Sequence, residues 1–255
     1  MSEQSADQGE HPDIPTRWAA TTGQTGATGP TEPSQPSEPD IPTRWASATD
    51  QAEPDIPTRW AAATEPNIPT RWAASTTHPD MWVDPADDPR DTGAELTDEK
   101  STLTYYLRAY RQTLEMKCDG LNAGQLAARS VPPSTMSLLG LVRHMADVEL
   151  VWFRRTMAGQ DVPWVFRTDD DRDAAWNGAV GDPQTVAKAW QAWRDEVTFA
   201  EHFVAGASDL GVQAATRDGG TISLREVLVH VIEEYARHCG HADLIRERID
   251  GRTGQ

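Results

Sequence analysis

Apolar residues recur at helical spacing near the C-terminal end of the chain. In the segment 221–250, a turn of about 100° per residue places the aliphatic side chains on one stripe. The segment also begins with a capping box. The Ser223 side chain can accept a hydrogen bond from a backbone N–H of the first turn, while the Glu226 side chain can accept one from the backbone N–H of Ser223. A lone glycine, Gly240, lowers helix stability by only about 1 kcal/mol. The pattern therefore predicts one long helix, whose aliphatic stripe contains Val227, Val231 and Ile245.

The same spacing predicts three more helices, over residues 97–117, 134–158 and 183–205. The turn residues Asp119-Gly120 end the first, and Asp182 followed by a proline begins the third. The repeating apolar positions are Leu103, Leu107, Tyr110 and Leu114 in the first, Leu141, Val148 and Val151 in the second, and Val186, Trp190, Trp193, Val197 and Phe203 in the third. Four such helices joined by loops predict an all-α fold, an antiparallel four-helix bundle, over residues 95–255.

The first part of the chain has no helical periodicity. Residues 1–95 hold 14 of the 18 prolines and few aliphatic residues, a composition that cannot bury a core. We therefore expect residues 1–94 to form a disordered acidic tail, whose last part, 79–93, is a linker to the folded domain.

A short repeat stands out in this tail. The sequence PDIPTRWA begins at Pro12, Pro39 and Pro54, PNIPTRWA begins at Pro66, and a degenerate copy, PDMWVD, begins at Pro79. Unequal spacers argue against a solenoid, and the Trp and Arg of each unit are residues that dominate binding hot spots. Several units on one tether predict binding to a multivalent protein partner, whereas duplication of a linker without a ligand is the alternative. The expected contact residues are Ile14, Arg17, Trp18, Ile41, Arg44, Trp45, Ile56, Arg59, Trp60, Ile68, Arg71 and Trp72.

Charge and cysteine content exclude several classes of function. The net charge of −17 falls mostly on the tail, where 17 acidic and 5 basic residues among the first 95 give −12. This charge argues against binding to nucleic acid or to an anionic membrane surface. The chain has neither an apolar leader nor a run of about 18 apolar residues, so we expect no membrane span. Two cysteines, Cys118 and Cys239, imply no disulfide framework and are consistent with a cytoplasmic location.

Candidate chemistry lies on the apolar stripe of the C-terminal helix. Glu234, His238 and His241 share this stripe, and His230 lies at its edge. Burial of a carboxylate or an imidazole is costly unless a hydrogen-bond partner or a metal ion interacts with it. Glu234 and His238, at i and i+4, can bind one metal ion from a single helix. His144 lies on the apolar face of the second predicted helix and is the best candidate for a third ligand. Each histidine taken alone also fits a core histidine that bonds to a carbonyl group.

Two segments together carry a family resemblance: LLGLVRHMADVELVWFRR around His144 and, about 90 residues later, HVIEEYARHCGHADLIRE. Over residues 96–250 the chain resembles the DinB-like metal-dependent four-helix bundles, in the branch related to mycothiol-dependent maleylpyruvate isomerase and other thiol S-transferases. That branch has Glu in place of the first His of an HxxxH pair, as at Glu234 and His238. The resemblance implies a metal site of His144, Glu234 and His238, with zinc as the usual metal.

The resemblance also implies an activity. A thiol such as mycothiol would bind the open position on the metal and attack a small electrophile, in a transfer or an isomerase-like reaction. His241 would support the site as a partner of a ligand or as a proton shuttle. The isomerase has an additional C-terminal domain that is not found here, and no motif identifies thiol-binding residues. A catalytically silent adaptor or cargo protein, targeted to a larger assembly by its repeats, is the alternative function.

Overall fold

The computed structural model describes residues 71–78 and 80–254. Residues 1–70 of the predicted disordered tail, which hold all of the repeats except Arg71, Trp72 and the residues that follow them, lie outside the described residues. The described part therefore comprises the end of the fourth repeat, the acidic segment after it and nearly all of the predicted helical domain.

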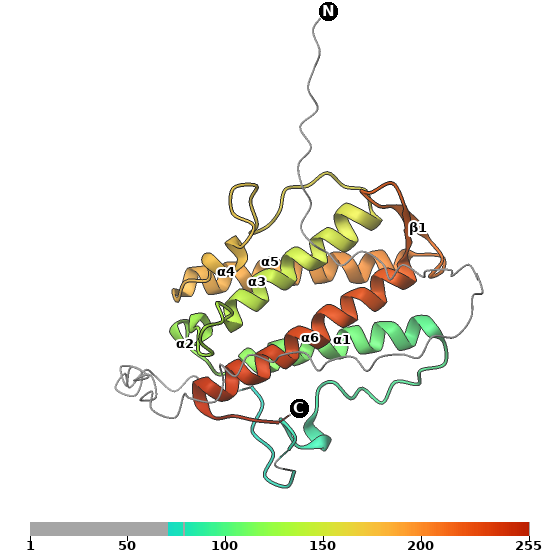
Figure 1. Cartoon of the computed structure of the whole chain (residues 1–255). Helices are drawn as coiled ribbons and strands as arrows, with labels where there is room; N and C mark the ends of the chain where they lie inside the picture. The colour runs from blue at the N-terminus through green and yellow to red at the C-terminus, as the bar shows by residue number, and fades with distance from the viewer. Residues whose placement is uncertain (1–70, 79, 255) are drawn as a thin grey trace, which may run out of the picture. The chain divides into compact units, whose positions relative to one another are not determined.

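Four long helices dominate this part of the chain, and side-chain caps at their first residues explain where they begin (Figure 1). Asp98, Ser137, Asp182 and Ser223 each accept a hydrogen bond from a backbone N–H of the first turn. The capping box of Ser223 and Glu226 is present as predicted. The helices are α1 (Glu99–Cys118), α3 (Leu138–Glu149), α5 (Pro183–Gly206) and α6 (Leu224–Asp250).

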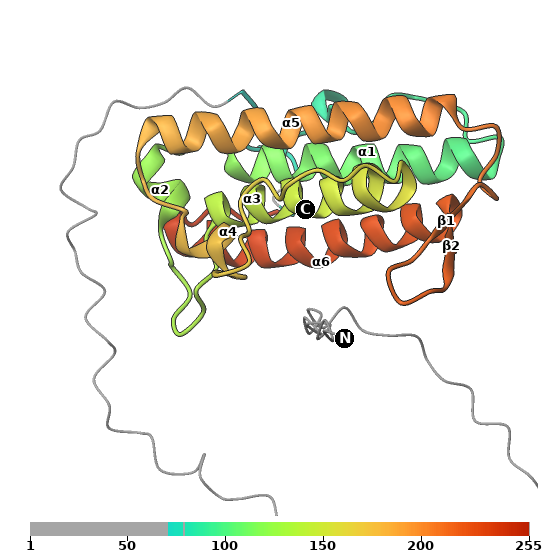
Figure 2. The same cartoon turned by 90° about the horizontal axis from the view of Figure 1, so that it is seen from above.

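The four helices share one apolar core. α1 packs along α6 and α3 packs along α5, with further contacts from α3 to both α6 and α1 (Figures 1 and 2). Aliphatic residues of the predicted stripes, such as Leu114, Leu141 and Val231, have no exposed surface. The predicted all-α character is therefore confirmed. Among the described residues, no helix combines the length and the hydropathy that a bilayer crossing requires.

Shorter elements complete the described structure. They are the 3-10 helix η2 (Pro85–Asp87), α2 (Ala123–Ala127), the π-helical segment η3 (Leu150–Met157), α4 (Ala174–Asn177), β1 (Gln213–Ala215) and β2 (Thr221–Ser223). The second predicted helix thus begins four residues late and ends in π-helical turns. Residues 221–223 are strand rather than helix, because they pair antiparallel with residues 213–215 before Ser223 caps α6. Strands of only three residues are too short to show the alternating pattern that predicts a strand from sequence.

Part of the expected linker over residues 79–93 packs on the helices. Trp82 and Val83 are each only 1% exposed and contact Met116 near the end of α1. The indole of Trp82 lies under three cations, 3.9 Å from Arg252, 4.0 Å from Lys117 and 5.2 Å from Arg246. This segment therefore packs on the helices, anchored by one tryptophan in an otherwise polar stretch.

A candidate metal site between α3 and α6

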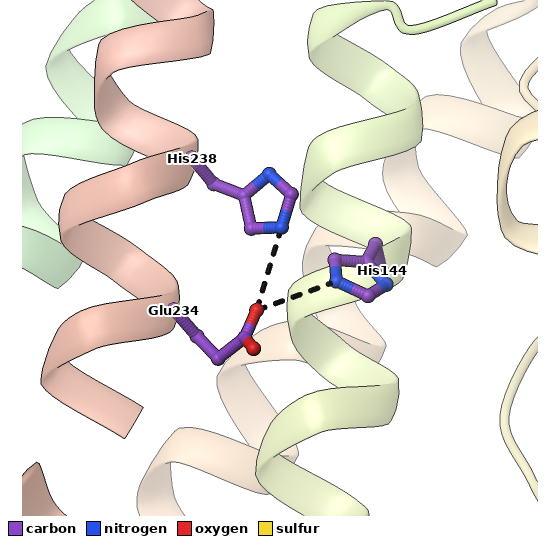
Figure 3. Close-up of side chains that lie close together, drawn as sticks. All are labelled: His144, Glu234 and His238. Atoms are coloured by element: carbon purple, nitrogen blue, oxygen red, sulfur yellow. Dashed lines mark ion pairs between the residues drawn. The ribbon is translucent and has the colours of Figure 1, made fainter. Parts of the chain in front are cut away.

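Three potential metal ligands converge between α3 and α6. His144 comes from α3, whereas Glu234 and His238 come from successive turns of α6 (Figure 3). Their ligand atoms all lie within 4.8 Å of one another. One carboxylate oxygen, Glu234 Oε2, lies 3.5 Å from His238 Nε2 and 4.0 Å from His144 Nε2. The structure thus brings together the three residues that the sequence singled out.

The surroundings keep these side chains largely away from water. The exposed fractions of the side chains are 11% for His238, 19% for Glu234 and 30% for His144. Val231, one turn before Glu234, is fully buried, so α6 presents its apolar stripe and its polar pair to the same interior face. The greater exposure of His144 leaves access to the site from its own side.

The donor set fits zinc. Two imidazoles and one carboxylate form a set found at catalytic zinc centres, where a fourth position stays open. Ligands at about 2.0–2.2 Å from one tetrahedral ion lie roughly 3.4 Å from one another. The ligand atoms, 3.5 Å and 4.0 Å apart in the two pairs with Glu234 and within 4.8 Å of one another in all, would therefore move closer together to bind one ion.

Electrostatics favours the protonation states that a metal ion needs. The imidazoles of His144 and His238 bond to the Glu234 carboxylate and hold its pKa well below the ordinary value, although burial opposes this shift. Burial lowers the pKa of His238, only partly opposed by Glu234. Glu234 is therefore ionised and His238 is neutral near pH 7, which are the forms that bind metal ions.

Two further histidines contact this cluster. His241 Nδ1 lies 3.2 Å from His238 Nδ1, the ring nitrogen that faces away from Glu234. On the other side, His230 Nε2 lies 3.7 Å from Glu234 Oε1, and the His230 ring packs edge-on against Trp152 at 4.6 Å. His241 thus lies beside the nitrogen of His238 that points away from the centre of the cluster, and His230 lies beside the oxygen of Glu234 that does so. Partners in such positions orient metal ligands in proteins.

A tryptophan from the long loop before α5 covers His144. The rings of Trp176 and His144 stack with centroids 5.2 Å apart. Gly140, one turn earlier on α3, makes room for this indole, because a Cβ atom there would lie 2.6 Å from Trp176 Cε3. Arg143 fixes the loop from the other side by donating to the carbonyl oxygens of Ala174 and Ala175, each at 2.8 Å.

The same loop is tied to α3 by a second residue. The carboxylate of Asp147, which is 6% exposed, accepts hydrogen bonds from three consecutive backbone N–H groups, those of residues 165–167. Burial nevertheless raises the pKa of Asp147, with these bonds opposing the shift. The loop over residues 160–181 is therefore a fixed wall of the site.

A buried polar network supports α6 behind the site. Tyr235, adjacent to Glu234, donates to Glu149 Oε1 at 2.8 Å and accepts from the indole N–H of Trp193 at 2.8 Å. Arg111 binds both oxygens of Glu149, each at 2.8 Å. Burial alone would lower the pKa of Arg111, but the Glu149 carboxylate outweighs it and raises that pKa. The network joins α1, α3, α5 and α6, so it sets the rotation of α6 that turns Glu234 toward His144.

Other features of the described chain lack this convergence. A cavity of about 690 Å³ lies between α1 and α5, lined by residues such as Leu107, Arg108 and Val204, and it includes none of the three candidate ligands. Cys118 and Cys239 are free and buried, and burial raises both thiol pKa values, that of Cys239 to about 12. The chemistry is therefore concentrated at the His144–Glu234–His238 cluster.

The sequence placed the polar cluster but not the aromatic residues around it. Helical spacing put Glu234, His238 and His241 on one stripe and His230 at its edge, where the structure has them. Trp176 was only one of several tryptophans in a polar connection, and no local pattern ties it to His144. Of the predicted partner-binding residues, Arg71 and Trp72 lie at the end of α1, in a different part of the structure, and the rest lie outside the described residues.

A family model and a solved structure are similar to parts of this chain. A family model described as mycothiol-S-transferase matches residues 102–251, more than half of the chain and the part that contains the whole cluster. A solved structure titled "Crystal structure of the conserved protein of locus from Enterococcus faecalis" is similar, with 16% sequence identity and a TM-score of 0.39 over 60% of this chain and 95% of that chain. No curated protein matches the sequence.

Proposed function

Because this chain belongs to the mycothiol-S-transferase family, we propose that it transfers mycothiol, or a similar low-molecular-weight thiol, to a small electrophile at a zinc ion. Membership of the family indicates activity of the thiol S-transferase kind. The zinc site, the residues and the partners are our proposal. The observation that carries it is the convergence of His144, Glu234 and His238 within 4.8 Å.

In this proposal the three residues hold the metal ion. A zinc ion held there would lower the pKa of a bound thiol, so that the nucleophilic thiolate would be available at neutral pH. His238 binds through Nε2, and His241 keeps that ring oriented through its contact with Nδ1. His241 can also accept the proton that the thiol releases.

The chain's own cysteines support an external thiol. Cys118 and Cys239, the two cysteines of the chain, are buried and their pKa values are raised, so neither offers a thiolate at neutral pH. The nucleophilic sulfur must therefore come from a co-substrate. Trp176 and the fixed loop form the wall against which that co-substrate or the electrophile would rest.

The four long helices form a DinB-like antiparallel four-helix bundle in this proposal, supported by the packing of α1 on α6 and of α3 on α5. From composition alone, we keep the proposal that the N-terminal repeats belong to a disordered tail that docks a multivalent protein partner. The partner-docking role does not depend on the thiol chemistry.

The enzymatic proposal is tested by mixing zinc-loaded protein with mycothiol and a panel of small electrophiles. We expect acceleration of thiol addition that Glu234→Ala abolishes, whereas the exposed Glu247→Ala leaves it unchanged. Consumption of one thiol per electrophile indicates transfer, and conversion of the electrophile without net thiol loss indicates isomerase-like catalysis. If no electrophile reacts faster with the protein than without it, the thiol-transfer proposal fails and the adaptor function replaces it.

A further inference from the structure

The end of α1 and the C-terminal residues hold the last part of the fourth repeat. The indole of Trp72 packs against the apolar cluster of Trp82, Val83 and Met116. We call the surface formed by Trp82, Glu115, Met116, Asp119 and Arg252 the repeat site. It is separate from the metal site, since Asp250, close to Arg252, lies twelve residues, or about 18 Å of helix, beyond His238.

The Arg71–Trp72 pair makes two backbone hydrogen bonds, an ion pair and an apolar contact to the repeat site. Asp119 Oδ2 accepts from the Arg71 backbone N–H at 2.5 Å, and Arg252 Nη2 donates to the Trp72 carbonyl oxygen at 3.1 Å. The Arg71 guanidinium lies 3.9 Å from the Glu115 carboxylate and 4.1 Å from the centre of the Trp72 ring. The Arg71 side chain is 60% exposed, so its ion pair contributes little and the indole contributes most.

Nothing in these contacts is particular to the fourth unit. The same residues, Ile-Pro-Thr-Arg-Trp-Ala, occur around Trp18, Trp45 and Trp60. The chain therefore carries four equivalent ligands, whereas the part of it that the structure describes holds one repeat site. We propose that this surface is a specific binding site for the repeat unit, and that its partner in trans is a repeat from a second copy of this chain.

Exchange of repeat units between two copies of the chain depends on the chain concentration. The fourth unit is tethered close to the repeat site, so its effective concentration there is on the order of millimolar. A unit from a second chain forms the same contacts as the one that it displaces, which makes exchange between copies inexpensive, as in domain swapping. Two chains that exchange units reciprocally replace two contacts within chains by two identical contacts between chains, so association rises as the chain concentration approaches the effective concentration of the tethered unit. The inference rests on the proposal that the repeats are binding units, and it names their partner.

The test uses two full-length variants that separate ligand from site. The acceptor has an intact repeat site but carries Trp18→Ala, Trp45→Ala, Trp60→Ala and Trp72→Ala. The donor keeps all four repeats but carries Asp119→Ala and Arg252→Ala. Sedimentation velocity should show each variant alone as a monomer and their mixture as a complex. The matched control is a donor that also lacks the four tryptophans, which should form no complex with the acceptor.

A labelled peptide of residues 12–20 gives a second measurement that needs no association of whole chains. It should bind the acceptor, and its binding should weaken by about tenfold or more when its tryptophan is replaced by alanine or when the donor is used instead. Helical circular dichroism and zinc content, expected to be equal in both variants, show that folding and the metal site are intact. Absence of both the mixed complex and peptide binding, or a complex that survives in the control, overturns the inference and leaves the thiol-transfer proposal unaffected.

Discussion

His238 and Glu234 are each held at two atoms. His238 turns Nε2 toward the centre of the site and Nδ1 toward His241, while Glu234 turns Oε2 toward the centre and Oε1 toward His230. A side chain held at both ends loses little further freedom when it binds an ion, so the site is preorganised for a metal. His144 is held differently, by the stacked ring of Trp176.

The first prediction concerns His241. Replacement by alanine should lower zinc affinity by about 10–100-fold, the usual loss when a partner of a metal ligand is removed. His241→Gln, which can still bond to His238 Nδ1, should recover part of this loss. Competition for zinc with a chelating dye measures both effects, with the exposed His202→Ala as control. Equal zinc affinity in His241→Ala and wild type would show that His241 does not orient His238.

At the scale of elements, capping residues and apolar spacing predicted the long helices, whereas the shorter segments that pack around them were not predicted. The caps Asp182 and Ser223 and the apolar spacing predicted three of the four long helices to within three residues, and Asp98 caps the first of them. The hairpin before α6, the π-helical end of α3 and the burial of Trp82 were not predicted. The strands of the hairpin have three residues each, too few for an alternating pattern, and Trp82 is buried by contact with Met116, which is distant in the sequence.

The candidate site was likewise predicted only in part. Periodicity alone placed the two α6 ligands on one face, and the i, i+4 spacing made them a pair. His144 was a candidate because it lies on an apolar helical face, but spacing alone cannot show that it faces this pair, since the register of α3 against α6 depends on core packing and on the network of Arg111, Glu149 and Tyr235. The position of Trp176 required the fold of the whole 160–181 loop.

The second prediction tests the contact between α4 and α3. Gly140→Ala places a methyl group 2.6 Å from Trp176 Cε3, so the indole must leave its position against His144. The control is Gly240→Ala on α6, where nothing lies within 4 Å and the helix should gain about 0.5–1 kcal/mol. We expect Gly140→Ala to change tryptophan fluorescence and weaken zinc binding, unlike the control. Unchanged fluorescence and zinc affinity would mean that Trp176 does not wall the site.

The third prediction tests the packing of the segment before α1. Trp82→Ala removes a side chain that is 1% exposed, a change that typically costs about 3–5 kcal/mol where the residue belongs to the fold. Amide exchange over residues 80–94 should accelerate, and the thermal midpoint should fall. The control is Leu244→Ala, whose side chain is 57% exposed on α6. A midpoint that falls no further than in this control would restore the view of residues 79–93 as a linker.

For the whole molecule, α6 runs from the candidate metal site toward the proposed repeat site. Its middle carries Glu234 and His238, and its C-terminal end leads to Arg252 of the repeat site. No residue is shared between the two sites, so mutations in one should leave the other unchanged. The acidity of the chain lies mostly in its first 95 residues, with −12 of the total −17, which precede the long helices in the sequence.

The zinc content of protein purified without a histidine tag tests the central claim most directly. After zinc is supplied and the excess removed, wild type should retain about one zinc ion per chain, because three ligands converge on one point. His144→Ala and Glu234→Ala should each retain far less, while the exposed-residue controls His202→Ala and Glu247→Ala should match wild type. Full zinc retention by both ligand variants, or wild-type protein that retains no zinc, would contradict the account.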